Sequence, residues 1–265
     1  MKIMIKKKLG LVLFVLFVLN FSACSSGGKY KFNANNGFYI WSDNLDFIRN
    51  GKYYNFNLED GEHEVYSGET KLPKEINTND IIALNGGYIF VKKNNTIVRY
   101  EEDFEEDVDV SFFKITDYYK AFEIQNNKYK SIVIPATSWI IIHNKDSFST
   151  YFLDDKSEWN LHSTINLEKE YDSSFLLSLY MGELILGFVK GNTIDIVPVN
   201  FKEGTAEVIK QLELDKQYDA YVGYLPDGDI LYLGCIENNK IRFLDTRSGV
   251  FVKKPFTGEE LSWVF

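Results

Sequence analysis

The chain is poor in the residues on which much protein chemistry depends. Its 265 residues include two cysteines, three histidines and five prolines. Two cysteines cannot build the disulfide framework that stabilises small secreted domains. The histidines His63, His143 and His162 lack the spacing of paired metal ligands, so we expect no metal site.

The common catalytic motifs are also missing from the sequence. It contains no G-x-S-x-G, no H-E-x-x-H, no P-loop and no G-x-G-x-x-G after a strand-like run. We therefore identify no catalytic residue and no cofactor. An enzymatic activity would have to rely on carboxylates that the fold brings together.

Acidic residues outnumber basic ones, 38 to 29, and the formal net charge is −9. The first 23 residues contain four lysines and no acid, which leaves 25 basic against 38 acidic residues in the rest. This excess repels phosphate backbones and anionic lipid headgroups, and we expect no nucleic-acid partner. With 45% hydrophobic and 16% aromatic residues, the chain can bury a sizeable core.

The first 23 residues have the pattern of an export signal. Lys2, Lys6, Lys7 and Lys8 precede an apolar run from Leu9 to Leu19. This run is too short for a bilayer core, which takes about 20 residues, but it suits the hydrophobic region of a signal peptide.

The segment Phe21-Ser22-Ala23-Cys24 resembles the lipobox of bacterial lipoproteins, with Phe21 where leucine is usual. The resemblance implies that Cys24 carries diacylglycerol, a palmitate-type lipid attachment, and becomes the new N-terminus. The alternative is an ordinary signal peptide that is cleaved after Ala23. Ser25-Ser26-Gly27-Gly28 would begin a flexible tether over 24–36. The other cysteine, Cys235, lies in an apolar run and is expected to be a buried side chain.

The mature chain consists of short runs rich in Ile, Val, Tyr, Phe and Thr that are separated by polar turns, which predicts an all-β fold. The best helical periodicity, over 204–214, also alternates. Several turns are Asn or Gly dipeptides, which tolerate the positive φ of tight hairpins. These are Asn50-Gly51, Asn94-Asn95, Asn126-Asn127, Gly191-Asn192 and Asn238-Asn239.

Five segments align as an internal repeat with a period of about 44 to 51 residues. Each is an apolar run that starts at a small residue, and each is followed by a second strand. The first runs are Gly37–Trp41, Gly87–Val91, Ser138–Ile142, Gly182–Leu186 and Gly228–Tyr232, and the following strands are Tyr53–Phe56, Thr96–Tyr100, Phe148–Phe152, Thr193–Val197 and Ile241–Leu244.

A repeat of 40 to 50 residues with four short strands is the unit of a β-propeller. The last unit has an expected innermost strand over Tyr218–Tyr224, and its turns resemble those in blades of WD-repeat and related bacterial propellers. We expect a propeller of about five, possibly six, four-stranded blades over 37–265. The apolar segment Leu261–Phe265 could close the ring, and the segment Phe112–Pro135 contains an extra hairpin that fits the scheme poorly. A β-sandwich or a pair of meanders is the alternative.

Two features remain as candidate sites. Seven acids lie within Glu101–Asp109, and we interpret them as a solvated loop, because no calcium-binding loop motif is present. Asp154, Asp155 and Glu158 are expected to form a turn. Among the tryptophans, Trp41 and Trp139 are expected to pack in strands, whereas Trp159 is the best candidate for an exposed anchor.

Three functions fit these observations. The first is a lipid-anchored, non-enzymatic platform of the cell envelope that binds a protein or a carbohydrate, on the cell membrane or outer membrane and facing the periplasm or the exterior. The second is a carbohydrate-active propeller hydrolase, which would need carboxylates in its central channel and one of them with a raised pKa. The third is a purely structural envelope protein.

Overall fold

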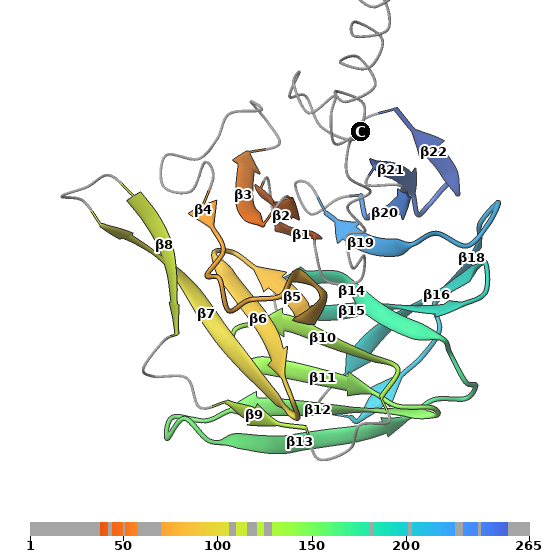
Figure 1. Ribbon diagram of the computed structural model, residues 1–265. Coiled ribbons are helices and arrows are strands. Elements are labelled where there is room, and N and C mark those ends of the chain that lie inside the picture. The colour runs from red at the N-terminus through yellow and green to blue at the C-terminus, as the bar shows by residue number, and fades with distance from the viewer. Residues whose placement is uncertain are drawn as a thin grey trace, which may run out of the picture. The chain divides into compact units, whose positions relative to one another are not determined.

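The computed structural model describes residues 38–41, 44–49, 51–57, 70–105, 110–115, 121–124, 129–180, 183–200, 203–225, 230–237 and 240–253. These residues form five antiparallel sheets, each built from consecutive segments of the chain (Figure 1). The expected signal peptide 1–23, Cys24, the expected tether 24–36 and Leu261–Phe265 lie outside the described residues. The all-β prediction is confirmed.

Each sheet is one blade, numbered here in chain order. Blade 1 contains β1 (Phe38–Trp41), β2 (Asn44–Arg49), β3 (Lys52–Asn57) and β4 (Thr70–Lys71). Blade 2 follows a short 3-10 helix, η1 (Thr78–Asp80), and contains β5 (Ile81–Asn85), β6 (Tyr88–Lys93), β7 (Thr96–Glu105), β8 (Val110–Ile115) and β9 (Phe122–Glu123).

Blades 3 to 5 complete the chain in the same way. Blade 3 contains β10 (Ser131–Ala136), β11 (Trp139–His143), β12 (Ser147–Leu153) and β13 (Trp159–Asn166). Blade 4 contains β14 (Ser173–Tyr180), β15 (Glu183–Lys190), β16 (Thr193–Asn200), β17 (Thr205–Ala206) and β18 (Lys210–Glu213). Blade 5 contains β19 (Ala220–Tyr224), β20 (Tyr232–Glu237), β21 (Lys240–Asp245) and β22 (Val250–Val252).

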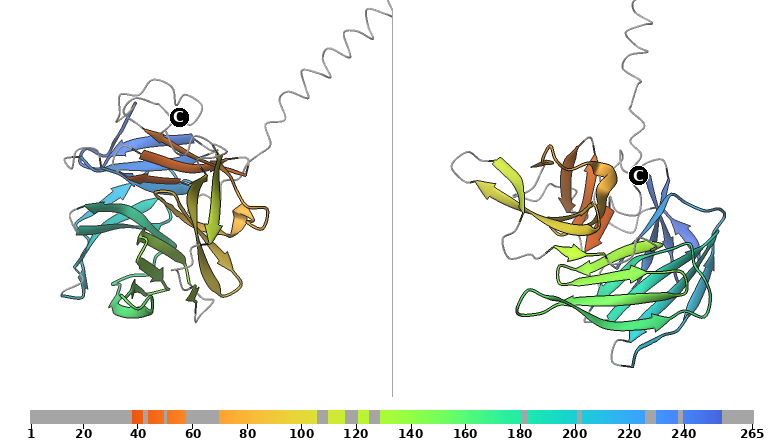
Figure 2. Two further views of the ribbon diagram at one scale, coloured as in Figure 1. Left: turned by 90° about the vertical axis from the view of Figure 1, so that its left-hand side faces the viewer. Right: turned by 60° about the horizontal axis from the view of Figure 1, so that its bottom comes forward.

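The blades form a closed ring around their first strands. β1 contacts β5, β5 contacts β10, β10 contacts β14, β14 contacts β19, and β19 contacts β1. The right-hand view of Figure 2 shows the blades following one another around this ring, from orange through yellow, green and teal to blue. The expected five-bladed propeller is therefore confirmed.

Apolar side chains fill the space between each pair of neighbouring blades. One hydrophobic cluster lies between blades 1 and 2, and equivalent clusters lie between blades 2 and 3, 3 and 4, and 4 and 5. A fifth joins Leu45 and Phe47 of blade 1 to Val222 and Phe243 of blade 5. The second strands of blades 2 to 5 contain nearly unbroken apolar runs because both of their faces are buried against neighbouring blades.

The turn chemistry matches the sequence at the described hairpins. Gly51, Asn94 and Gly191 have φ values of 72°, 56° and 61°. These are left-handed conformations that Gly and Asn adopt at low cost. In blade 5, the innermost strand was expected within Tyr218–Tyr224, and it is observed as β19.

Two expectations need correction. Gly37–Trp41 was aligned with the second strands, but β1 is a first strand and β2 occupies the second position. The acidic run was expected to be a loop, yet β7 continues through Glu105 because its cross-strand pairing with β8 extends that far.

The poorly fitting hairpin in blade 2 has a structural explanation. β8 and β9 both pair with β7, so two short strands share the outer position of this blade. In blade 4, β17 and β18 share the edge of β16 in the same manner. A split outer strand lengthens these two units without changing the number of blades.

Candidate functional site

The two ends of the ring carry different connections. At one end lie the connections from first to second and from third to fourth strands, and their described residues include four acidic and two basic ones. At the other end lie the turns between second and third strands and the links between blades, whose described residues include eight acidic and five basic ones. The strand ends beside these turns carry Lys52, Lys71, Lys93, Lys190 and Lys240, together with Glu123, Glu213 and Glu237. We call the first end the loop end and the second the link end.

Three aromatic side chains gather on one side of blade 3, beside the loop end. The Trp139 ring lies 5.8 Å from the Phe152 ring and 5.5 Å from the His162 ring, centroid to centroid. Trp139 is half-buried, His162 is exposed, and Phe152 is 38% exposed. Because Trp139 pairs with Phe152 across β11 and β12, the rigid sheet fixes their separation. We call these three residues the aromatic patch.

The loop between β12 and β13 is held in place next to the patch. One carboxylate oxygen of Asp154 accepts hydrogen bonds from the backbone N–H groups of Lys156 and Glu158, at 2.9 and 2.8 Å. The other accepts one from the side-chain amide of Asn160 at 2.9 Å. The backbone donors lower the pKa of Asp154. This confirms the expected turn and gives the patch an ordered, polar border.

An apolar side chain of blade 4 faces the same side of blade 3. Leu179 pairs with Leu184, and Leu184 belongs to the cluster between blades 3 and 4. Leu179 therefore projects toward blade 3, and it is 38% exposed. Exposed apolar groups on adjacent blades are a recurring feature of surfaces that bind a partner.

A second cluster lies between blades 1 and 2. The carboxylate of Asp46 accepts a hydrogen bond from the backbone N–H of Gly86 at 2.8 Å, and the Tyr53 hydroxyl accepts one from that of Gly87 at 2.9 Å. The Thr70 hydroxyl donates to Glu102. These bonds insert the β5–β6 turn of blade 2 against blade 1.

The carboxyl group of Glu102 has a strongly shifted pKa. Burial raises its pKa from 4.5 to about 7, the hydrogen bond from Thr70 opposes the rise, and the charge of Asp46 adds to it. A carboxyl group that is half-protonated near neutral pH can act as a general acid. Asp46 is 1% exposed, so in this conformation it cannot contact a substrate as a second carboxylate.

His143 and Cys235, which the sequence analysis also singled out, are both buried. His143 is 0% exposed, with its Nδ1 atom 3.3 Å from the Ser131 hydroxyl. Its Nε2 atom has no hydrogen-bond partner within the described residues. Cys235 is 0% exposed, as expected. His63 lies outside the described residues.

The two tryptophans of blade 3 exchange their expected roles. Trp159 packs edge-on against Phe122 at 5.6 Å and joins the cluster between blades 2 and 3. Trp139, which was expected to pack in the core, belongs to the aromatic patch. The side chain of Trp41 lies outside the described part of the structure.

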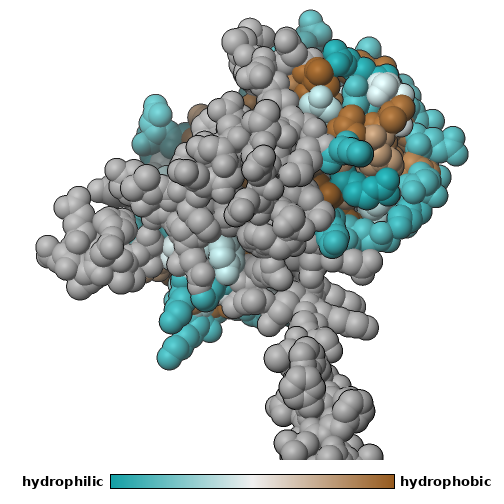
Figure 3. Space-filling model, turned by 90° about the horizontal axis from the view of Figure 1, so that it is seen from above, coloured by the Kyte–Doolittle hydropathy of each residue, from teal (hydrophilic) through white to brown (hydrophobic). Residues whose placement is uncertain are grey.

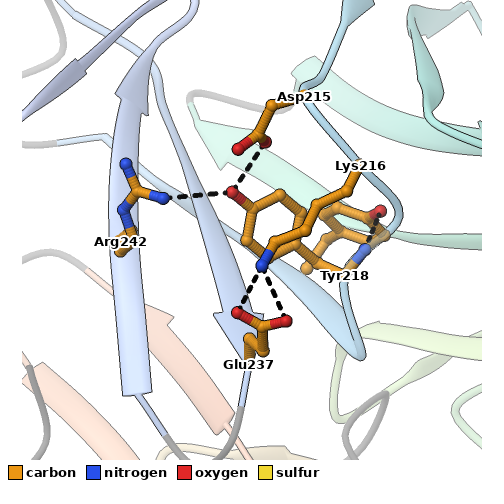
Figure 4. Close-up of polar contacts among 6 residues, drawn as sticks. Asp215, Lys216, Tyr218, Glu237 and Arg242 are labelled. Carbon is orange, nitrogen blue, oxygen red and sulfur yellow. Dashed lines mark hydrogen bonds and ion pairs between the residues drawn. The ribbon is translucent and has the colours of Figure 1, made fainter.

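A repeated motif at the link end was not recognised in the sequence. Leu167-Glu-Lys-Glu-Tyr171-Asp and Leu214-Asp-Lys-Gln-Tyr218-Asp precede β14 and β19 at equivalent positions. In Figure 4, the Tyr218 hydroxyl donates to Asp215 at 2.9 Å and accepts from Arg242 at 3.3 Å. Beside it, Lys216 binds both carboxylate oxygens of Glu237. The Tyr171 hydroxyl instead donates to the buried Asp195 at 2.6 Å. These contacts fix the links between blades.

Other exposed apolar groups do not add up to a large patch in the view of Figure 3, where apolar atoms of described residues lie in small groups among hydrophilic ones. Within the described residues, no group of three or more His, Cys, Asp or Glu side chains is placed to hold a metal ion. The same residues include no helix with the length and apolar character needed to cross a bilayer.

Comparison with known proteins yields structural similarity alone. No protein-family model and no curated protein matches the sequence. A protein from Desulfotomaculum acetoxidans described as functionally unknown is 13% identical, with a TM-score of 0.48 over 82% of this chain and 70% of that one. Virginiamycin B lyase from Staphylococcus aureus is 14% identical, with a TM-score of 0.41 over 86% and 73%. Kluyveromyces lactis Hsv2 is 13% identical, with a TM-score of 0.38 over 82% and 62%. Similarity at this level says nothing about what this chain binds.

Proposed function

We propose that this protein is a lipid-anchored, non-enzymatic binding platform of the bacterial cell envelope. Its ring of five blades is a rigid support, and the aromatic patch of Trp139, Phe152 and His162 contacts the partner. The partner is an envelope protein or a carbohydrate, since both recognise aromatic rings presented on a surface.

The aromatic patch is the observation that carries the binding role. Aromatic rings are large apolar groups, and leaving Phe152 38% exposed forgoes part of the stabilisation that burial would give. The rings are held by cross-strand pairing, so a partner that covers them would lose little conformational entropy in the platform.

Photo-crosslinking in intact cells tests the patch. A photoreactive phenylalanine analogue at Phe152 should form a discrete adduct, and Trp139→Ala should abolish that adduct. The same analogue at Val250, which is 60% exposed in blade 5, is the matched control. No adduct at Phe152, or an equal adduct at Val250, would contradict the role of the patch.

The anchor is supported by the lipobox-like segment that ends at Cys24. Cys24→Ser should abolish metabolic labelling of the protein with radioactive palmitate, whereas Ser25→Ala should leave it unchanged. Labelling that persists in Cys24→Ser would refute the lipid attachment and leave an ordinary secreted protein.

A hydrolase that acts on carbohydrate is the second candidate, and the pKa of about 7 at Glu102 favours it. This role requires that Asp46, or another carboxylate, become accessible when substrate binds. If purified protein releases reducing sugar from envelope polysaccharide, and Glu102→Gln stops the release, the hydrolase replaces the non-enzymatic platform.

A further inference from the structure

We propose that β13, the outer strand of blade 3, binds an extended segment of a partner protein as an added strand, and that this segment is uncharged in its middle and basic at its ends. The inference rests on the proposed platform and deepens it, because it names the partner as a protein and the mode of binding as strand addition. His162 of the aromatic patch belongs to β13, so the added strand runs beside that patch.

Within the described part of the chain, β13 has a strand partner on one side alone. It pairs with β12, and no other described strand pairs with it, so it forms the outer border of blade 3 (Figure 1). Asn160, Thr164 and Asn166 are exposed, and Leu161 is 58% exposed. The side chains along this border therefore leave the strand accessible to another chain.

Hydrogen bonds at the two ends of β13 show which of its residues face outward. The backbone N–H of Leu167 donates to the residue before β12, so Thr164 and Asn166 face away from β12, because the direction alternates along a strand. At the other end, the backbone C=O of Glu158 accepts from the residue after β12, so Leu161 also faces away. These outward-facing residues present the backbone N–H and C=O groups with which an added strand would pair.

The other outer strands are protected from such pairing by their length or their charge. β4, β9 and β17 have two residues each, and β22 has three. β8 has six residues and includes Lys114, and β18 has four residues and includes Lys210 and Glu213. β13 has eight residues, and none of them is Asp, Glu, Lys, Arg or Pro. Short strands and charged side chains commonly keep sheet edges from pairing, and β13 has neither protection.

A β-bulge in the middle of β13 makes this edge selective. Thr150 pairs with Ser163 and Tyr151 pairs with Leu161, so His162 is an extra residue of β13. The bulge divides the edge into two short ladders. A partner strand pairs with both ladders only if it has an irregularity at the same place, and an arbitrary β-strand pairs with one of them.

Charge at the two ends of β13 determines the kind of partner. The segment before it, 154–158, contains three acidic residues and one lysine, and the segment after it, 167–170, contains two acidic residues and one lysine. The second lysine, Lys169, is bound to the buried Asp195. A strand with lysine or arginine at both ends complements this edge. A second copy of the chain does not, because pairing of two β13 strands places acidic segments side by side.

Peptide binding to the purified full chain tests the proposal. The probe is a fluorescent peptide in which threonine and valine alternate between a pair of lysines at each end, and fluorescence anisotropy measures its binding. The same peptide with one glycine added in its middle, to match the bulge, should bind several-fold more tightly. Glutamates in place of the lysines should weaken binding several-fold at low salt. Absence of binding by both lysine peptides, or equal binding of the glutamate peptide, would overturn the proposal.

Methylation of the peptide backbone tests strand addition directly. The backbone N–H groups of an added strand alternate between facing β13 and facing solvent. Methylation of one alternate set of nitrogens should therefore abolish binding, and methylation of the other set should leave it unchanged. Binding that survives methylation of either set would show that the peptide does not pair with a strand.

A charge placed on β13 provides the matched test in the protein. Leu161→Lys gives this edge the protection that the other edges have, and it should weaken binding of the lysine peptides several-fold. Val250→Lys, the same change at a 60% exposed position of β22, should leave binding unchanged. Equal effects of the two variants would overturn the role of β13. Self-association of the full chain that Leu161→Lys abolishes would identify a second copy as the occupant and would also overturn the proposal.

Crosslinking at Phe152 in cells measures the platform separately. An adduct at Phe152 without binding of either lysine peptide would overturn strand addition and retain the platform. Absence of both the adduct and peptide binding would overturn the two together.

Discussion

Gly223 of β19 lies against the backbone of Leu177 in β14 so closely that a Cβ atom on the glycine would stand 1.5 Å from the Leu177 carbonyl oxygen. The two residues belong to the first strands of blades 5 and 4, which contact each other at the centre of the ring. Leu177 is the extra residue of a β-bulge in β14, and the bulge brings its carbonyl toward blade 5. Glycine at position 223 is therefore a requirement of ring packing.

Gly223→Ala should destabilise the protein by about 3 kcal/mol or more, because backbone, unlike a flexible side chain, cannot move away from the new methyl group. Gly51→Ala is the control. Its Cβ would meet nothing within 4 Å, but its φ of 72° makes alanine unfavourable by about 1 to 2 kcal/mol. Urea unfolding followed by tryptophan fluorescence measures both. An equal loss in the two variants would show that the contact with Leu177 carries no special cost.

The sequence was sufficient for blade 5 and misleading for blade 1. In blade 5, the composition of the turns predicts where the strands begin and end. The turn-forming residues are Thr246–Gly249 and those beside β20. In blade 1, β1 and β2 are both short strands, and only two residues separate them in the sequence. Their order could not be assigned without the contact between β1 and β19, which joins opposite ends of the chain.

Of the candidate site residues, the direction of the Glu102 side chain could be predicted from the sequence. Val98, Tyr100 and Glu102 alternate along β7, and the first two belong to the cluster between blades 1 and 2. The period of two therefore points Glu102 toward blade 1, despite the acidic run in which it lies. The aromatic patch was not accessible in this way, because the register of β11, β12 and β13 brings its residues together.

Glu102→Gln should make the protein more stable at alkaline pH. In the folded protein the pKa of Glu102 is about 7, compared with 4.5 when unfolded, so folding favours the protonated form. Stability is therefore lost as the pH rises from 4.5 to 7, by up to about 1.4 kcal/mol per pH unit. Glutamine stays neutral, so the variant should exceed the wild type by about 1 to 3 kcal/mol at pH 8 and match it near pH 4. Urea unfolding at each pH gives the difference, and a constant difference would contradict the shifted pKa.

His143→Phe should have the opposite effect on the pH profile. Burial, together with the charge of Lys130, lowers the pKa of His143 from 6.5 to about 4. The folded state therefore resists protonation, and stability is lost as the pH falls from 6.5 to 4. Phenylalanine should remove this loss and retain the packing against Phe188, whose ring centroid lies 5.3 Å away.

The two groups oppose each other between pH 4.5 and 6.5. In the wild type their slopes should nearly cancel, whereas Glu102→Gln should reveal a loss of stability toward acid and His143→Phe a loss toward neutral pH. If the three proteins show parallel profiles across this interval, then neither residue titrates in it as the structure indicates.

Cys235 should be inert in the folded protein. Burial raises the pKa of its thiol to about 12, and the charge of Asp215 contributes further. Because the thiolate is the reactive form, a disulfide reagent at pH 8 should not modify it until the protein is unfolded. Mass spectrometry after brief exposure, with and without urea, measures the modification. Rapid modification without urea would show that blade 5 opens readily.

Tyr171 and Tyr218 offer a matched pair for measuring what the repeated links between blades contribute. Both precede a first strand by two residues and donate a hydrogen bond to a carboxylate, but Asp195 is 1% exposed whereas Asp215 is exposed.

Tyr171→Phe removes one donor from a buried charge that also accepts from Lys169 and Gln211. Losing a hydrogen bond to a buried charged group costs about 1.5 to 3 kcal/mol. Tyr218→Phe should cost less than about 1 kcal/mol, because water can replace the hydroxyl at Asp215. Urea unfolding of the two variants measures both costs. Equal costs would mean that the phenol rings, packed between blades at both positions, stabilise the links and that the hydroxyl groups do not.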